Sequence, residues 1–276
     1  LTAGWSVPLV DLQLVDESLH TLPRDGKAVG EVVVRAPWLT QGYRGNAEAS
    51  EVLWQGGYLH TQDMGRIDAT GCLRLVDRIN TLRADAVVIA GDFTYKPDGE
   101  PLERMFAPLE TLQKPVYAVL GNHDQQAPGP DIDAELRAAL ATHGVQVIEG
   151  RTVTVRGFGV AGLGDRWAGK DDPGFLAARQ APGPILVLAH NPDSAIALDP
   201  ARVALVLAGH THGGQIRIPW LYRHVIPSQY GFDRGEQFLR TPHGRVRVYT
   251  TVGTGEIGLP MRLFNPPTID VLDLRP

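Results

Sequence analysis

Four short apolar segments, each followed at once by Asp, Asn or His, constrain the fold of this chain more than any other feature. The segments are residues 86–90, 116–120, 185–189 and 203–208. Apolar runs of this length are typical of buried strands, and α/β folds place their chemistry where such strands end. The pattern therefore predicts an α/β domain whose polar side chains meet at one edge of a sheet.

The polar clusters that follow these segments supply the ligand types of a transition-metal site. Mixed oxygen and nitrogen ligands suit Mn, Fe, Zn or Ni better than Cu(I), which prefers sulfur. Two such cations about 3.5–4 Å apart clamp a phosphoryl group and lower the pKa of a bridging water. We therefore predict one or two divalent transition-metal ions, held by the carboxylate, amide oxygen and imidazole nitrogens of Asp92, Asn122, His190, His210 and His212.

His123 and Asp124 follow Asn122 directly in the sequence. A histidine in this place can donate to a phosphate oxygen or protonate a leaving group, so we take His123 and Asp124 as the catalytic candidates. Each residue has an ordinary alternative when it is taken alone, because Gly-Asp and Asn are common in turns and a single buried histidine commonly binds backbone. The shared position of these residues at strand ends favours a site.

Residues 79–276 resemble the calcineurin-like metallophosphoesterases. The resemblance rests on DAVVIAGD at residues 85–92, VLGNHD at 119–124, HNPD at 190–193, LAGHTHGGQI at 207–216 and the proline-rich tail at 253–267. The form GHTHGGQI with this tail resembles the branch that contains small membrane- or wall-associated bacterial phosphoesterases. The resemblance implies a four-layer αββα sandwich, in which helices lie outside two packed sheets.

The same resemblance implies roles for the candidate residues. Asp92 would bridge the two metals, His212 would serve one metal site and His123 would act on the transition state. The other metal site would be completed by Asn122, His190 and His210.

The chain departs from this family at its first motif. The family opens with a strand that ends in Asp-x-His, and both residues are ligands of the site that His212 serves. No Asp-x-His occurs anywhere in the sequence. We therefore expect an incomplete sandwich without its first strand, and one metal site without two of its ligands. The nearest substitute is the pair His60 and Asp63, whose spacing differs by one residue.

Residues 1–78 resemble a second family, the adenylate-forming acyl-CoA synthetases. The motifs are GEVVVRAP at residues 30–37, GYR at 42–44, WQGGYLHTQD at 54–63, GRID at 65–68 and VDR at 76–78. In that family the residues that match Asp63 and Arg78 hold the nucleotide ribose, and Gln62 stands where the family usually has glycine. The phosphate loop and the lid with its catalytic lysine are absent from the sequence. We therefore expect a small β-rich segment without ligation activity.

The seam between the two resemblances lies near residues 73–80, which suit either the end of the synthetase-like segment or a helix before the Asp92 strand. We predict a chimera with one domain at residues 1–78 and a metallophosphoesterase domain at 79–276. Residues 30–35 are a candidate to fill the place of the missing strand, although we favour loose packing between the segments.

Three functions are compatible with the sequence. The first is a phosphoesterase acting on a phosphomonoester, phosphodiester or pyrophosphate. The others are a catalytically inactive fusion product and an AMP-forming synthetase fragment.

Composition narrows the partners of the chain. A net charge of −5 argues against a nucleic-acid-binding surface, and the single cysteine, Cys72, excludes an internal disulfide. No apolar run reaches the ~20 residues that span a bilayer. We expect a small-molecule or lipid-like phosphoester as substrate, with a membrane surface as a second candidate partner and a cytoplasmic or membrane-associated location in a bacterium. The oligomeric state stays open.

Several residues near the motifs allow more than one reading. Trp167, Trp220 and Tyr222 could line a groove for an apolar group or simply pack. We favour packing for Trp167 and give the two alternatives equal weight for Trp220 and Tyr222. Arg262 suits either a phosphate contact or a contact within the tail.

The missing Asp-x-His leads to a prediction of metal content. Because one of the two sites lacks two ligands, we expect the purified protein to retain close to one transition-metal ion per chain instead of two. Elemental analysis after dialysis measures this ratio. Two tightly bound equivalents would contradict the prediction and would show that the N-terminal segment supplies replacement ligands.

Overall fold

The computed structural model of the chain describes residues 2–4, 6, 9–16, 18–42, 47–75, 78–94, 101–125, 131–177, 183, 185–218, 220, 222–256 and 262–275. The chain forms two compact units, Leu1–Arg83 and Ala84–Pro276. The predicted domain boundary lies after Arg78, five residues before the division between the units. Each unit is described by itself.

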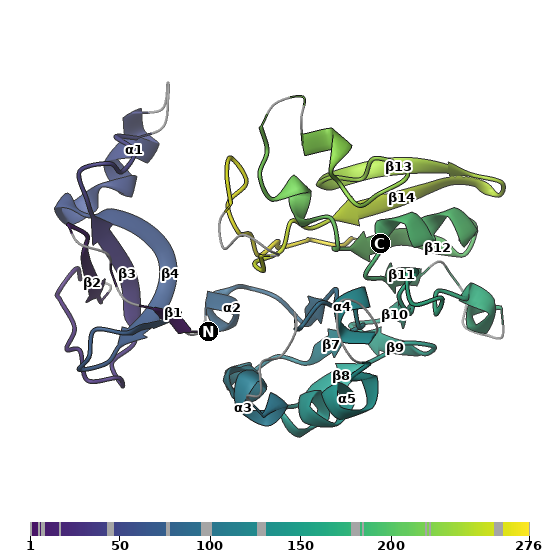
Figure 1. Cartoon of the computed structure of the whole chain (residues 1–276), viewed down its shortest axis with the longest axis horizontal. Coiled ribbons are helices and arrows are strands. Elements are labelled where there is room, and N and C mark those ends of the chain that lie inside the picture. The colour runs from purple at the N-terminus through teal and green to yellow at the C-terminus, as the bar shows by residue number, and fades with distance from the viewer. Residues whose placement is uncertain are drawn as a thin grey trace. The chain divides into compact units, whose positions relative to one another are not determined.

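The N-terminal unit is a five-stranded antiparallel sheet with the strand order β1-β5-β4-β3-β2 (Figure 1). Its core is small, because the alternating inward side chains form one cluster around Leu12, Leu14, Val32 and Ile67. The elements are β1 (Thr2–Gly4), β2 (Asp11–Val15), β3 (Gly30–Arg35), α1 (Ala47–Leu53), a 3-10 turn (Gln55–Gly57), β4 (Leu59–Ile67), β5 (Leu73–Leu75) and α2 (Arg78–Thr81). Strand β3 pairs with β2 on one side and β4 on the other, so it does not fill the place of the missing phosphoesterase strand.

The C-terminal unit begins with a three-stranded parallel sheet of β6 (Val87–Ile89), β7 (Val116–Ala118) and β8 (Val145–Val147). One face of this sheet is covered by α3 (Leu102–Phe106), the 3-10 helix η2 (Ala107–Thr111) and α5 (Asp133–Thr142), which share a hydrophobic cluster with the strands. Strand β6 lies at an edge of the sheet, and Val88 on it is 39% exposed. An edge at this position agrees with the absence of the family's first strand.

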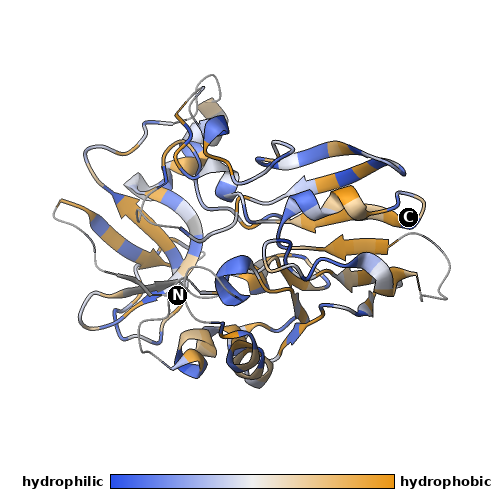
Figure 2. Cartoon of the chain, turned by 45° about the vertical axis from the view of Figure 1, so that its right-hand side comes forward, coloured by the Kyte–Doolittle hydropathy of each residue, from blue (hydrophilic) through white to orange (hydrophobic). Residues whose placement is uncertain are grey.

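The second sheet of this unit has six strands in the order β13-β14-β12-β11-β10-β9. Its central strands are apolar along their whole length (Figure 2). The bounds are β9 (Thr152–Val155), β10 (Phe158–Gly162), β11 (Ile185–Leu188), β12 (Val203–Ala208), β13 (Gly235–Thr241) and β14 (Gly244–Thr250). Strands β10, β11, β12 and β14 run parallel to their neighbours in this series, which brings the carboxyl ends of β11 and β12 to one edge.

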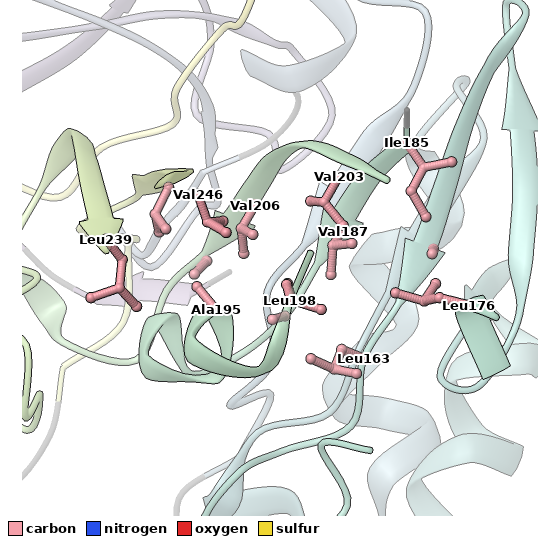
Figure 3. Close-up of a cluster of buried hydrophobic side chains, with 14 of the residues drawn as sticks. Leu163, Leu176, Ile185, Val187, Ala195, Leu198, Val203, Val206, Leu239 and Val246 are labelled. Carbon is pink, nitrogen blue, oxygen red and sulfur yellow. The ribbon is translucent and has the colours of Figure 1, made fainter. Parts of the chain in front are cut away.

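Two hydrophobic clusters hold the six-stranded sheet. The first joins alternate residues of β11 and β12 to the 3-10 helices η3 (Pro173–Leu176) and η4 (Pro192–Ala197) (Figure 3). The second joins the opposite face to Val119 and Ile148, which follow β7 and β8 of the smaller sheet. The layers are therefore α-helices, a small sheet, a large sheet and 3-10 helices, and the predicted α/β sandwich is confirmed.

The helical stretches expected at residues 101–113 and 134–143 are present as α3 with η2 and as α5. Cys72 is buried and forms no disulfide. Within the described part of the chain, no helix is both long and apolar enough to cross a membrane.

The difference in core size leads to a prediction for hydrogen exchange. We expect the amides of β12, which is buried on both faces, to be more strongly protected than those of β3, whose sheet has a small core. Native-state hydrogen exchange followed by mass spectrometry measures both segments in one experiment. A single cooperative melt with equal protection in the two strands would show that the units form one core.

Candidate metal centre

Four strand ends deliver polar side chains to one point in the C-terminal unit. Asp92 follows β6, Asn122 follows β7, His190 follows β11 and His210 follows β12. The Nε2 atom of His190 lies 2.9 Å from Nδ1 of His210, 3.2 Å from Oδ1 of Asn122 and 3.3 Å from Oδ2 of Asp92. Potential ligand atoms of Asp92, His190 and His210 all lie within 4.8 Å of one another.

The hydrogen bonding of His190 shows that this arrangement suits a cation. Its Nδ1 donates to the carbonyl oxygen of Ala90 at 2.6 Å, so Nε2 of the neutral ring carries a lone pair. That lone pair faces the oxygens of Asn122 and Asp92, which are also acceptors. Ligand atoms bound at about 2.1 Å around one ion are separated by roughly 3–3.4 Å. The donor set therefore fits a divalent transition metal.

Without a metal, a proton takes the place of the cation. Burial lowers the pKa of His190, but the charge and hydrogen bond of Asp92, together with Asp165 and the Ala90 carbonyl, outweigh burial and raise that pKa to about 9. Burial raises the pKa of Asp92, but the charge and hydrogen bond of His190, together with His123, outweigh it and lower that pKa to about 2. Burial and the neighbouring charge of His190 lower the pKa of His210 to about 3.

The backbone at this site is strained and closely packed. Asp92 has φ 55° and His210 has φ 66°, a left-handed region that costs of order 1–3 kcal/mol for residues with side chains. A Cβ at Gly121 would lie 2.1 Å from Oδ1 of Asp92, and a Cβ at Gly91 would lie 2.9 Å from Nδ1 of His190. Glycine at these two positions lets the Asp92 and Asn122 loops touch.

Asp124 organises these loops. Its side chain is fully buried and accepts hydrogen bonds from the amides of Gly121, Phe93 and Thr94 at 2.9, 3.2 and 3.1 Å. Burial raises its pKa to about 6 despite the hydrogen bond from Gly121. This geometry suits a role for Asp124 in positioning the loops, and a part of Asp124 in catalysis stays a prediction.

His123 begins next to the cluster. Its backbone amide donates to Oδ1 of Asp92 at 3.1 Å, and its side chain is half-buried. This hydrogen bond orients the carboxylate that faces His190 and fixes the start of the short helix α4 (Asn122–Gln125). The backbone of the predicted acid catalyst is thus anchored to a predicted metal ligand.

His212 lies outside the three-residue cluster. Its Nδ1 lies 3.3 Å from the carbonyl oxygen of Gly255, which can only accept a hydrogen bond. In the neutral ring the proton is therefore on Nδ1, and Nε2 carries the lone pair. Arg262 donates to the same carbonyl and to that of Val252, so it makes the tail contact that we considered. Among the described residues, no second group of three carboxylate, histidine or cysteine ligands forms.

The N-terminal candidates have partners within their own unit. His60 binds the carboxylate of Glu31 and the carbonyl oxygen of Gln55, both at 2.9 Å, within its own unit. Asp63 lies on β4 and is half-buried. The side chain of Arg78 lies outside the described residues.

Two further residues lie beside the centre, and sequence reasoning missed one of them, Asp165. Trp167, for which we favoured packing, is 58% exposed, and its ring packs edge-to-face at 4.6 Å from that of His210. Asp165 is fully buried. A signal for it was present, because the apolar strand β10 leads into Gly164-Asp165 in the layout of the other four motifs. Of the remaining aromatics, Trp220 is 79% exposed and Tyr222 packs under the Arg217 guanidinium at 4.0 Å.

An α/β sandwich with such a cluster at its strand ends is the architecture of a metal-dependent hydrolase. The profile described as calcineurin-like phosphoesterase matches residues 59–214. Phosphodiesterase YaeI of Escherichia coli is 31% identical over 199 residues, which are 70% of this chain and 71% of that protein. The metallophosphoesterase YkuE of Bacillus subtilis is 30% identical over 208 residues, which are 71% of this chain and 70% of that protein. The chain belongs to the calcineurin-like phosphoesterase family.

A second similarity is to adenylate-forming enzymes. A long-chain-fatty-acid–CoA ligase of Thermus thermophilus is 41% identical over 80 residues, which are 29% of this chain and 15% of the ligase. The chain thus carries a fragment similar to these ligases in addition to its phosphoesterase domain. A solved amide bond synthetase from Marinactinospora thermotolerans is 40% identical, covers 29% of this chain and 16% of the synthetase, and has a TM-score of 0.27.

The raised pKa of His190 leads to a prediction of pH-dependent metal affinity. In the metal-free protein His190 keeps its proton up to about pH 9, whereas in the unfolded chain it loses the proton near 6.5. The stability that this proton contributes is fully present below pH 6.5 and is lost as the pH rises to about 9. A metal must displace the proton, so its apparent Kd should fall about tenfold per pH unit between 6.5 and 8.5.

Calorimetric titration with Zn²⁺ at several pH values measures this dependence. His243→Gln, which changes an exposed histidine, is the control and should leave the slope unchanged. A metal affinity independent of pH over this range would contradict the assignment of His190 as a ligand.

Proposed function

We propose that this chain hydrolyses a phosphomonoester, phosphodiester or pyrophosphate in a reaction that requires a divalent transition metal. The observation that carries the proposal is the convergence of His190 Nε2, His210 Nδ1 and two oxygens of Asn122 and Asp92. Because Nε2 of His190 faces these three acceptor atoms, a divalent cation placed among them would take over the role of the His190 proton. The name of the relative YaeI supports a phosphodiester as the first substrate to test.

Each residue of the centre has a distinct part in this proposal. Asp92, Asn122, His190 and His210 would hold the ion, which when bound would polarise the phosphoryl group and activate a water. His123 would donate a proton to the leaving group. Its backbone is held against Asp92 and its side chain is half-buried, so it is both oriented and accessible.

The second metal position of the family would be weakened in this chain. His212 presents Nε2 there, but the sequence contains no Asp-x-His to complete the set. We therefore propose that turnover is impaired relative to a two-metal enzyme. An inactive fusion product is the alternative, and the experiment below distinguishes the two.

Ligation remains the less favoured function. The synthetase-like fragment offers Asp63 on β4 as a ribose contact, and the sequence has neither a phosphate loop nor a lid lysine. The two ribose contacts that the resemblance implies, Asp63 and Arg78, would contribute hydrogen bonds of roughly 0.5–3 kcal/mol each. That free energy does not supply useful ATP affinity, because the loss of entropy on binding is of similar or larger size.

Removal of Asn122 tests the proposed function. Asn122→Ala deletes one oxygen from the ligand set, so we expect Mn²⁺-dependent hydrolysis of bis(p-nitrophenyl) phosphate to fall by about 100-fold or more. Steady-state kinetics and metal content should be measured on the same preparations. Gln146→Ala removes an exposed amide from β8 and is the matched control, which should keep the wild-type rate. Full metal-dependent turnover by Asn122→Ala would refute the site, and no turnover by the wild-type chain would favour the inactive product.

A further inference from the structure

Trp167 is an exposed aromatic side chain in direct contact with the candidate metal centre. Its ring centroid lies 4.6 Å from that of His210 at an interplanar angle of 84°. His210 is 8% exposed, but the tryptophan is 58% exposed. Part of the indole therefore contacts a predicted ligand, while more than half of the tryptophan surface is exposed to solvent.

The turn that carries Trp167 is held from several sides. The carboxylate of Asp165 accepts the amide of Ala168 at 2.8 Å, and its carbonyl oxygen accepts the amide of Lys170 at 2.9 Å. A Cβ at Gly164 would lie 2.5 Å from the carbonyl oxygen of Lys170, so the two ends of the turn are in close contact. These contacts hold the backbone from which the Trp167 side chain extends.

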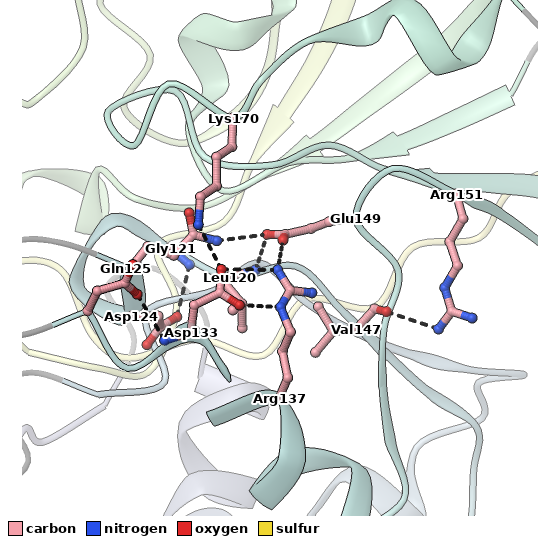
Figure 4. A network of polar contacts seen from close by, with 11 residues as sticks. Leu120, Gly121, Asp124, Gln125, Asp133, Arg137, Val147, Glu149, Arg151 and Lys170 are labelled. Atoms are coloured by element: carbon pink, nitrogen blue, oxygen red, sulfur yellow. Dashed lines mark hydrogen bonds and ion pairs between the residues drawn. The ribbon is translucent and has the colours of Figure 1, made fainter. Parts of the chain in front are cut away.

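An ion-pair network ties this turn to the metal loop (Figure 4). Lys170 Nζ binds Asp133 at 2.7 Å, and Asp133 binds Arg137 on the same helix, α5. Arg137 also binds Glu149, whose Oε1 accepts the amide of Leu120 at 2.8 Å. Leu120 stands just before the Asn122 loop. A continuous series of polar contacts therefore links the turn that carries Trp167 to the loop that carries Asn122.

The charged side chains near the Trp167 indole limit which chemical groups of a substrate can bind beside it. The guanidinium of Arg166 is paired with Asp171 at 3.1 Å, and the ammonium of Lys170 is paired with Asp133. The carboxylate of Asp172 lies in the same segment and caps Gly174. Within residues 165–172 each positive charge already has a carboxylate partner, so the surroundings do not favour a second anionic group of a substrate.

We propose that Trp167 is a specificity-determining residue that receives a neutral aromatic substituent of the phosphoester. The inference rests on the proposed function, because it places the phosphoryl group of the same molecule at the metal centre. An aromatic contact of this kind favours binding by about three- to tenfold over a ligand without the ring.

Two phosphonates test the inference by binding alone, since neither is hydrolysed. Phenylphosphonate and methylphosphonate present the same anion to the metal but differ in the ring. In calorimetric titrations of the full chain with Mn²⁺, we expect the wild type to prefer phenylphosphonate by about three- to tenfold. Trp167→Ala should lose this preference while keeping its metal content and its affinity for methylphosphonate. Trp167→Phe should keep part of the preference.

Trp38→Ala is the matched control, because Trp38 is 59% exposed and belongs to the N-terminal unit. It should keep the wild-type preference. If Trp167→Ala weakened both phosphonates equally or lost its metal, the tryptophan would serve to position His210, and the inference would be overturned while the proposed function stood. If neither phosphonate bound to the wild type with Mn²⁺, the proposed function would fail and the inference with it.

Discussion

The site depends on one electrostatic constraint, which is that several electron-pair donors point at the same place. The Ala90 carbonyl accepts a hydrogen bond from Nδ1 of His190. The other ring nitrogen, Nε2, therefore faces two oxygens and a second imidazole. A positive charge between them relieves the repulsion. That charge is a proton on His190 in the free protein, and a divalent metal fits the same point. Metal affinity and pH are coupled for this reason.

Backbone packing, more than side-chain bulk, brings the donors together. Gly91 and Gly121 allow two loops to touch, and Asp124 joins them through three amide hydrogen bonds. Left-handed backbone at Asp92 and His210 adds strain. The surrounding core offsets this cost, because β11 and β12 are buried on both faces and anchor the loops that follow them.

The strands and the histidine of the N-terminal unit find their partners within that unit. Strand β3 has partners on both sides within its own sheet, and His60 is engaged by Glu31. Strand β6 lies at an edge of its sheet, with Val88 partly exposed. Of the residues that the resemblance assigns to metal, Asp92, Asn122, His190 and His210 converge, whereas His212 lies outside the cluster.

The sequence by itself determined four strands of the C-terminal unit, β6, β7, β11 and β12, and the residues that follow them. Apolar runs followed by Asp, Asn or His are local signals, and they correctly placed Asp92, Asn122, His190 and His210 together at one edge. Only the tertiary structure showed that the buried carboxylate of Asp124 binds loop amides. Only the tertiary structure showed that the exposed ring of Trp167 packs against His210. The physical reason is that the pattern of apolar residues in a strand is a property of neighbouring residues along the chain. The contacts between loops and between aromatic rings depend on how strands and turns that are distant in sequence are aligned in the fold.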